Sequence, residues 1–306
     1  MKPAILDLDG SLPLQKELLK RYQPALCPLA SWGPAIRLGC SFRRFRGLER
    51  ALKTGAPPRE NGTGATLTLY GSGDFHHVSL ALVRRLKHPF HLLVLDKHPD
   101  WMRGLPFLHC GTWLYHAARL PTVRRVFHVG GDLDFDNAYR WLAPWSLLRD
   151  RKIVVWPAVR RFQKGNWPVV AHEPLREPGK NLWNPGRLED LLRPWREELA
   201  RYPLYISLDK DVMREEHAVV NWDSGHLHLG EVCAILEAFL RAAHGRLAGM
   251  DIVGDWSPVK VQGVLRRFLH LTEHPSLAVE PGDAAGRNEL TNLTLLETVL
   301  KKHKRH

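Results

Sequence analysis

Short apolar segments rich in β-branched residues alternate along the chain with segments of helical periodicity. The apolar segments predict strands that end in polar or acidic residues, at 66–70, 92–96, 126–129, 153–156, 204–209 and 250–253. Helical periodicity lies between them, at 78–86, 188–200, 231–243 and 290–302. This alternation predicts an α/β fold with a mostly parallel sheet, in which ligands bind beyond the carboxyl ends of the strands. The residues that close the strands are therefore the first candidates for chemistry.

The length and composition indicate one large core. The 306 residues are 44% hydrophobic and 25% charged, as in ordinary globular proteins. Stretches rich in proline and glycine at 55–64 and 168–186 predict surface loops, and neither is followed by a shift in composition. We therefore expect a single domain over residues 1–306.

Charge and cysteine content restrict the partners. The net charge of +12 favours acidic partners, but the basic residues are scattered except in the tail at 301–306. The four cysteines show no CxxC spacing, which argues against a zinc finger or a disulfide framework. No apolar run is long enough to span a membrane, and the first residues do not resemble a signal peptide. We expect a cytoplasmic protein with no membrane partner.

The segment LLVLDKHPD carries the first chemical motif. Asp96, His98 and Asp100 follow a buried strand, and a continued strand would place all three side chains on one face. Carboxylates together with an imidazole suit Mn, Mg, Fe or Zn. This segment therefore predicts ligands for a divalent metal ion.

Three further strand ends carry polar side chains. YISLDKDVM places Asp209 and Asp211 after a strand, and GSGDFHH places His76 and His77 between a glycine turn and a helix. Asp255 follows the strand at 250–253. Several clustered carboxylates repel one another unless cations compensate them. A pair of divalent ions about 3.5–4 Å apart would do so and would activate a water molecule.

These motifs, in this order, resemble the arginase and agmatinase superfamily. The family pattern is GGDH, DxHxD, SxDxD and an acidic residue before a proline, and this chain has GSGDFHH, DKHPD, SLDKD and GDWSP over residues 71–258. The resemblance implies a three-layer αβα arginase-like fold and two Mn²⁺ ions, although other divalent metals also suit the ligands. The implied metal ligands are Asp96, His98, Asp100, Asp209 and Asp211, together with His76 or His77, of which His76 lies closer to the Gly-Asp turn.

The resemblance also implies roles in catalysis and substrate binding. Asp100 would relay a proton, and His109 falls where arginases have a proton-shuttling histidine. Asp255 would receive the guanidinium group, at a position where arginases have Glu. The segment HVGGDLDFD resembles the turn that contacts the amino end of the substrate, with Asp132 and Asp134 as candidates.

One departure from the family pattern concerns the substrate. The loop WMRGLPFL lacks the Asn, Ser and Thr residues with which arginases bind the free α-carboxylate of arginine. The chain is similar to the divergent peptide arginases, which convert arginine side chains of ribosomally made peptides to ornithine and urea. The expected partner is therefore an arginine-containing precursor peptide. Loops around four tryptophans, expected to be exposed, could hold it: Trp101, Trp113, Trp167 and Trp222. Because arginases are often oligomeric, a homo-oligomer is also an expectation.

Several alternatives stay open at this point. A small-molecule guanidino hydrolase of the arginase or agmatinase kind would use the same site. Zinc-dependent deacetylases share the architecture and have adjacent histidines, but they typically use one metal and fewer carboxylates. The opening ILDLDGS resembles haloacid-dehalogenase phosphatases, in which the first Asp, here Asp7, is the nucleophile. A basic nucleic-acid-binding protein is disfavoured, because no binding motif accompanies the charge.

Overall fold

The computed structural model describes residues 2–55, 65–104, 107–131, 141–158, 174–176, 183–263 and 279–303. The strands are β1 (Ala4–Asp7), β2 (Ala25–Pro28), β3 (Gly39–Ser41), β4 (Thr66–Leu69), β5 (Phe90–Leu95), β6 (Phe107–His109), β7 (Val123–Val129), β8 (Ile153–Trp156), β9 (Leu204–Asp209) and β10 (Leu247–Val253). The α-helices are α1 (Lys16–Tyr22), α2 (Gly33–Ile36), α3 (Phe42–Gly55), α4 (Val78–Val83), α5 (Trp113–Ala118), α6 (Trp145–Arg149), α7 (Pro185–Leu192), α8 (Arg196–Leu199), α9 (Leu229–Ala242) and α11 (Pro281–His303). Short 3₁₀ helices are η1 (Leu12–Leu14), η3 (Gly73–Phe75), η4 (Cys110–Thr112), η6 (Arg193–Trp195) and η7 (Lys210–Val212).

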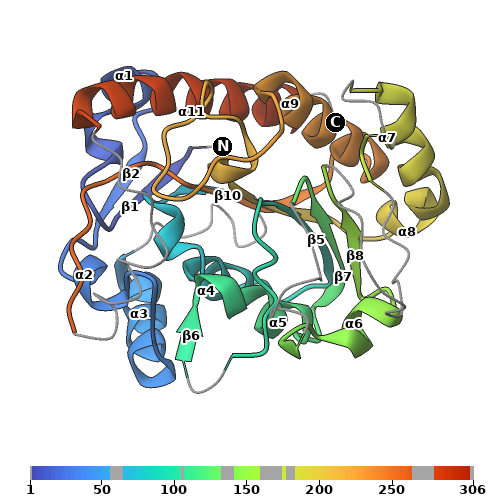
Figure 1. Cartoon of the computed structure of the whole chain (residues 1–306), viewed down its shortest axis with the longest axis horizontal. Coiled ribbons are helices and arrows are strands. Elements are labelled where there is room, and N and C mark those ends of the chain that lie inside the picture. Colours follow the sequence, from blue (N-terminus) through green and yellow to red (C-terminus); the bar gives the residue numbers. More distant parts are fainter. Residues whose placement is uncertain are drawn as a thin grey trace.

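Eight strands form one sheet in the order β2-β1-β4-β10-β9-β5-β7-β8. Every pairing between the described strands of this sheet is parallel, and all six predicted strands belong to it. Helices α1, α9 and α11 lie along one face, and α3, α4 and α5 lie along the other (Figure 1). The predicted three-layer αβα arrangement is therefore confirmed.

The side chains of β5 alternate between two cores. Leu93 and Leu95 pack in the core beneath α9 and α11, whereas Leu92 and Val94 pack in the core beneath α4 and α5. A strand covered on both faces needs a continuous apolar run, and all six residues of β5 are buried. Each buried leucine contributes roughly 1.5–3 kcal/mol, so β5 is a firm base for the residues that follow it.

The helix predicted at 188–200 is interrupted. Helix α7 ends at Leu192, and η6 separates it from α8. Pro194 lies within η6, where it has no N–H to donate and its ring crowds the preceding turn.

A second sheet, which the sequence pattern did not predict, borders the main one. Strands β3 and β6 pair antiparallel, with Gly39 opposite His109. Both strands line the cavity described below. Among the helices that the structure describes, none combines the length and apolar surface needed to cross a bilayer.

Candidate metal centre

Asp96 and Asp209 each begin a tight turn at the end of a strand. The Asp96 carboxylate accepts a hydrogen bond from the His98 main-chain N–H at 2.7 Å, and the Asp209 carboxylate accepts one from the Asp211 N–H at 3.1 Å. Aspartate favours such turns because its short side chain reaches the amide two residues further along. These turns, and not the continued strand expected from the sequence, bring the side chains of each motif together.

His76 reaches the same place from the neighbourhood of β4. Its Nδ1 lies 3.0 Å from Asp96 Oδ2 and 2.9 Å from Asp100 Oδ2. The same nitrogen is 3.6 Å from Asp209 Oδ2. One imidazole nitrogen therefore faces three carboxylates that come from two different strand ends.

A second group adjoins the first and shares Asp96 with it. His98 Nδ1 lies 2.8 Å from Asp211 Oδ2 and 3.9 Å from Asp96 Oδ1. The two oxygens of Asp96 thus face different imidazoles. His76, Asp96 and Asp100 form one potential ligand group, and Asp96, His98 and Asp211 form the other.

The local turn before His76 accounts for its position. Ser72 caps η3, and its hydroxyl accepts a hydrogen bond from the Asp74 N–H at 3.3 Å. Gly73 allows the turn to approach β9 closely, because a Cβ at Gly73 would lie only 2.7 Å from Asp209 Oδ2. The cap by Ser72 and the close approach at Gly73 therefore place His76 beside the carboxylates.

The centre is strongly acidic. The four carboxylates are almost fully buried, at 1%, 4%, 3% and 2% exposure for Asp96, Asp100, Asp209 and Asp211. Burial, followed by the charge of Asp211, raises the pKa of Asp209 well above its usual value. Burial lowers the pKa of His98, but Asp211 outweighs it and the pKa rises to about 9. The clustered negative charge therefore raises the proton affinity of these groups, as is typical of sites that bind cations.

The residues fit a pair of divalent cations. Nδ1 of His76 and Oδ2 of Asp96 are buried, and among the described residues neither has a hydrogen-bond partner. Both atoms face the cluster, where a cation would supply the partner that each lacks. Carboxylate oxygens with one imidazole per group are ligands that Mn²⁺, Fe²⁺ and Zn²⁺ accept.

The geometry distinguishes His76 from His77. His77 is also buried, but among the described residues it belongs to neither ligand group and does not line the cavity. It directly precedes α4, where the chain has already turned away. The expectation that kept His77 as an alternative ligand is therefore corrected in favour of His76.

A buried hydrogen-bond network, which sequence reasoning missed, orients His76. His76 Nε2 lies 3.0 Å from Ser207 Oγ, and the Ser207 hydroxyl donates to Asp251 Oδ1 at 2.7 Å. The hydroxyls of Tyr70 and Tyr205 also donate to Asp251. Occupying Nε2 in this way keeps Nδ1 directed at the carboxylates. The available signal was a carboxylate inside the apolar segment that forms β10.

Asp100 is held in an unusual conformation by a tryptophan. Its φ is 50°, in the left-handed region, and its Oδ2 accepts a hydrogen bond from Trp113 Nε1 at 2.7 Å. Trp113 and Trp101 are fully buried, which corrects the expectation that they lie in exposed loops. Trp222 does line the cavity, and Trp167 lies outside the described residues.

The centre opens into a cavity of about 990 Å³. The six residues of the centre line it together with His109. Aromatic and basic side chains, mostly from α3, β6 and nearby loops, complete the wall: Trp32, Arg43, Arg44, Arg50, Phe107 and Trp222. Burial lowers the pKa of His109, so this imidazole is neutral near pH 7 and can accept a proton.

Asp255 does not lie where the sequence prediction requires it. Its carboxylate is 1% exposed, forms an ion pair with Lys210 Nζ at 2.8 Å and accepts a hydrogen bond from Gln15 Nε2 at 2.6 Å. It is not among the residues that line the cavity. The expected guanidinium-binding role of Asp255 is therefore corrected, because this carboxylate already neutralises a buried lysine. The other two predicted substrate contacts, Asp132 and Asp134, lie outside the described residues.

The aspartates of the N-terminal ILDLDGS have a structural explanation. Asp9 accepts hydrogen bonds from the Ser11 hydroxyl at 2.7 Å, the Ser72 N–H at 3.0 Å and the Ser257 hydroxyl at 2.6 Å. Asp7 accepts a hydrogen bond from the Gly10 N–H at 2.9 Å. These contacts join the end of β1 to the loops after β4 and β10.

Comparison with known proteins places the fold. No family model matches the sequence. An uncharacterized protein of Thermotoga maritima is 25% identical over 195 residues, which are 63% of this chain and 60% of that protein, so the match spans less than two thirds of the relative.

Solved structures match over nearly the whole chain. Arginase from Bacillus subtilis has a TM-score of 0.55 and 12% identity, covering 97% of this chain and 98% of that one. Entamoeba histolytica arginase, solved in complex with L-ornithine, has a TM-score of 0.58 and 13% identity with the same coverage. Formimidoylglutamase from Bacillus subtilis has a TM-score of 0.55 and 14% identity, covering 99% and 88%. At these identities the likeness concerns the fold alone, and the chain therefore has an arginase-like fold.

Proposed function

We propose that this protein hydrolyses a guanidinium carbon–nitrogen bond, with a pair of divalent cations held around Asp96 and an arginine side chain of a peptide as substrate. The products are urea and a peptide that contains ornithine. The observation that carries the proposal is that Asp96 belongs to two potential ligand groups, each made of two carboxylates and one histidine. The arginase-like fold supports the proposal, since similar structures include two arginases and a formimidoylglutamase.

Two side chains beside the centre, Asp100 and His109, carry out the two proton transfers of the proposed reaction. When bound, the two cations, which we propose to be Mn²⁺, supply Lewis-acid activation of water near neutral pH. Asp100 accepts the proton of that water, with its Oδ2 held by the Trp113 indole. Water adds to the guanidinium carbon, the bond to the side-chain nitrogen breaks, and that nitrogen leaves as an amine. His109, on the cavity wall, passes the proton to it, so that guanidinium and water give urea and an ammonium group.

The size and lining of the cavity favour a peptide over a free amino acid. A volume of 990 Å³ lies at the upper end of the roughly 300–1,000 Å³ typical of small-molecule sites. Trp32, Phe107 and Trp222 offer aromatic surface to a chain on either side of the arginine. Asp132 and Asp134 remain our proposed contacts for the amino side of the substrate. A ribosomally made precursor peptide as partner and a homo-oligomeric assembly belong to the same proposal.

A urea-release assay tests this function. The full chain is loaded with Mn²⁺ and incubated with arginyl peptides, free arginine and agmatine, and both urea and peptide mass are measured. We expect urea and ornithine from peptides and little turnover of free arginine. Asp96→Asn is expected to lower turnover by more than the 10- to 100-fold typical of changes outside the direct ligands. Asp190→Asn, an exposed carboxylate on α7, is the matched control and keeps full activity.

The alternatives give different results in the same experiment. Turnover of agmatine or free arginine but of no peptide would indicate a small-molecule guanidino hydrolase. A protein that binds a single zinc ion and releases acetate from acetylated amines would be a deacetylase-like amidohydrolase. Two bound metals without urea from any guanidino compound would refute guanidinium hydrolysis.

A further inference from the structure

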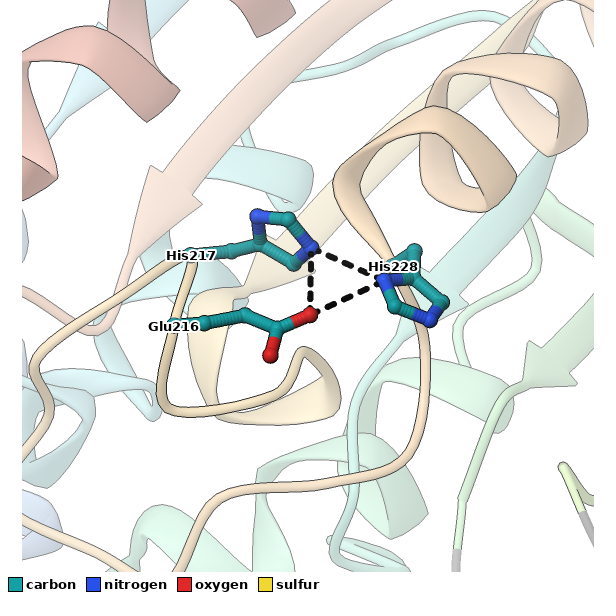
Figure 2. Close-up of side chains that lie close together, drawn as sticks. All are labelled: Glu216, His217 and His228. Carbon is teal, nitrogen blue, oxygen red and sulfur yellow. Dashed lines mark hydrogen bonds and ion pairs between the residues drawn. The ribbon is translucent and has the colours of Figure 1, made fainter.

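Three potential metal ligands gather outside the centre. Glu216, His217 and His228 point toward one another in Figure 2. His217 Nε2 lies 3.2 Å from His228 Nδ1 and 3.4 Å from Glu216 Oε1. His228 Nδ1 lies 3.0 Å from the same Glu216 oxygen. The side chains keep 55%, 26% and 43% of their surface exposed in chain order, so an ion can reach them from solvent.

These separations match a tetrahedral ion. With bonds of about 2.0–2.1 Å, a tetrahedral Zn²⁺ holds its ligand atoms about 3.3 Å apart. The three observed separations, 3.0, 3.2 and 3.4 Å, are centred close to that value. Hydrogen bonds explain the triangle less well, because a proton on either imidazole nitrogen can be directed to only one of its two neighbours at a time. A single cation satisfies all three lone pairs together.

The turn that carries Glu216 and His217 is anchored to α11. The Thr291 hydroxyl donates to the His217 carbonyl. Asn288 bonds both the N–H and the carbonyl of Val219, at 3.1 and 2.7 Å. These contacts hold the turn in one conformation before any ion binds, which favours a defined ligand geometry.

His228 is anchored at the start of α9. Its main-chain N–H donates to Glu231 Oε2 at 2.8 Å, and Glu231 forms a buried ion pair with Arg176 at 2.9 Å. Leu227, just before it, forms a bridge with Met213. The two histidines are therefore presented by separately fixed segments.

The segment between the two histidines, 217–228, contributes Trp222 to the cavity wall, and we call it the wall segment. Trp222 lines the cavity and donates its Nε1–H to Asp74 Oδ1 at 2.9 Å. Lys97 Nζ donates to the Ser224 carbonyl at 3.0 Å. His217 and His228 are the two ends of this segment. An ion bound between them would join the ends and restrict the movement of Trp222.

We propose that Glu216, His217 and His228 form a second, mononuclear site for a borderline divalent cation such as Zn²⁺. Water is the fourth ligand, and the bound ion restricts the movement of the wall segment. Two imidazoles and one carboxylate suit Zn²⁺ and neighbouring transition metals better than Mg²⁺ or Ca²⁺. The inference does not depend on the reaction at the Asp96 centre.

A cobalt titration tests the site. The full chain is stripped with a chelator, reloaded with excess Mn²⁺ and titrated with Co²⁺, whose visible absorption is intense when it is four-coordinate and weak at higher coordination. We expect the intense bands in the wild-type protein and in Asp96→Asn. They are lost in His217→Ala and in His228→Asn, which retains a residue able to cap α9. His88→Ala, an exposed histidine elsewhere, is the matched control and keeps the bands.

Glu216→Gln keeps the shape of the side chain, and its exposed position makes misfolding a poor explanation for lost binding. We expect its dissociation constant for Co²⁺ to be about tenfold or more above that of wild type, which is at least the loss typical of changes outside the direct ligands. At a free Zn²⁺ concentration about 100-fold above the wild-type dissociation constant, the ion should raise the melting temperature of wild type by about 4 °C and that of a tenfold weaker Glu216→Gln by about 2 °C. Absence of the bands in wild type, or their persistence in folded His217→Ala, would refute the site and leave a hydrogen-bonded triad only.

Discussion

At Asp96, one side chain sets the character of the whole centre. Its two oxygens face the imidazoles of His76 and His98, and its Oδ1 also accepts the His98 N–H that forms the turn. The same carboxylate therefore shapes the backbone and joins the two ligand groups. A residue of this kind cannot be replaced by Asn or Glu without changing either the turn or the second group.

Asp251 is joined to the candidate metal centre through Ser207 and His76, so we treat it as a positioning residue. Asp251→Asn is expected to lower Mn²⁺ affinity about 10- to 100-fold, as for other changes behind metal-bound histidines. Tyr205→Phe removes one donor to Asp251 but keeps the link to His76, and should change affinity little. Affinity is measured by competition with a chelator and compared with the free energy of unfolding. Lost stability with unchanged affinity would assign Asp251 a purely structural role.

The buried pair of Lys210 and Asp255 makes a separate prediction about stability. Burial lowers the pKa of Lys210, while Asp255 opposes that shift. Lys210→Met would leave Asp255 buried without its cation, which costs about 3–5 kcal/mol in the free energy of unfolding. Combining it with Asp255→Asn should recover most of the loss, as measured by urea denaturation. If Asp255→Asn instead kept full stability and raised only the KM for guanidino substrates, the earlier guanidinium-binding assignment would be restored.

At the scale of elements, the apolar runs predict the strands well but not their neighbours. The buried segment 92–96 corresponds to β5, which actually begins at Phe90. Its neighbours in the sheet, β9 and β7, come from distant parts of the chain. Strands β2, β3 and β6 are short and only partly buried, so periodicity did not reveal them. The pattern identifies an element when both of its faces are buried and loses it when only one is.

The buried position of His91 in β5 leads to a prediction about how the free energy of unfolding depends on pH. Burial lowers its pKa below the usual value near 6.5, and its Nε2 donates to the Glu198 carbonyl at 2.9 Å. The unfolded chain therefore binds a proton more readily than the folded one. This contribution is fully present above about pH 6.5 and is lost as the pH falls from there toward the folded pKa.

The measurement is urea denaturation at about pH 7 and about pH 5. His91→Gln can still donate to the Glu198 carbonyl but does not titrate, so the loss of stability on acidification should be smaller than in wild type. His88→Ala, an exposed histidine outside the sheet, is the control and should leave the pH dependence unchanged. Equal losses in wild type and His91→Gln would assign the acid sensitivity to other groups.

At the scale of the whole molecule, an acidic centre lies within a basic chain. The net charge is +12, yet four buried carboxylates meet at the carboxyl ends of β5 and β9. Arg43, Arg44 and Arg50 on α3 are exposed and line the same cavity. Under the proposed function, the acidic centre would bind the guanidinium group and these arginines would bind anionic parts of the substrate. We therefore expect a preference for peptides in which acidic residues accompany the arginine.

Arg43→Glu tests this charge pattern. We expect the KM for peptides with acidic residues beside arginine to rise about three- to tenfold, with kcat little changed, because surface charges contribute at most about 1 kcal/mol each. The effect should shrink at high salt. Arg46→Glu, on the same helix but outside the cavity lining, is the matched control. Equal effects of the two substitutions would indicate net charge alone, with no specific contact at Arg43.

The sequence by itself determined six of the eight strands of the main sheet, the parallel α/β architecture and the two acidic motifs at strand ends. Continuous apolar runs report burial on two faces, and Asp96, His98, Asp209 and Asp211 lie at turns set by the aspartate side chains. Only the tertiary structure selected His76 over His77, because a turn after β4 decides which ring meets carboxylates from β5 and β9.

Tertiary contacts alone also decided what each buried polar group does. Asp255 is paired with Lys210, and Asp251 is joined to His76 through Ser207. The partners in each contact come from different elements, and a one-dimensional pattern carries no information about which elements meet. Local chemistry is therefore readable from neighbouring residues, whereas the role of a buried charge depends on the partner that the fold brings to it.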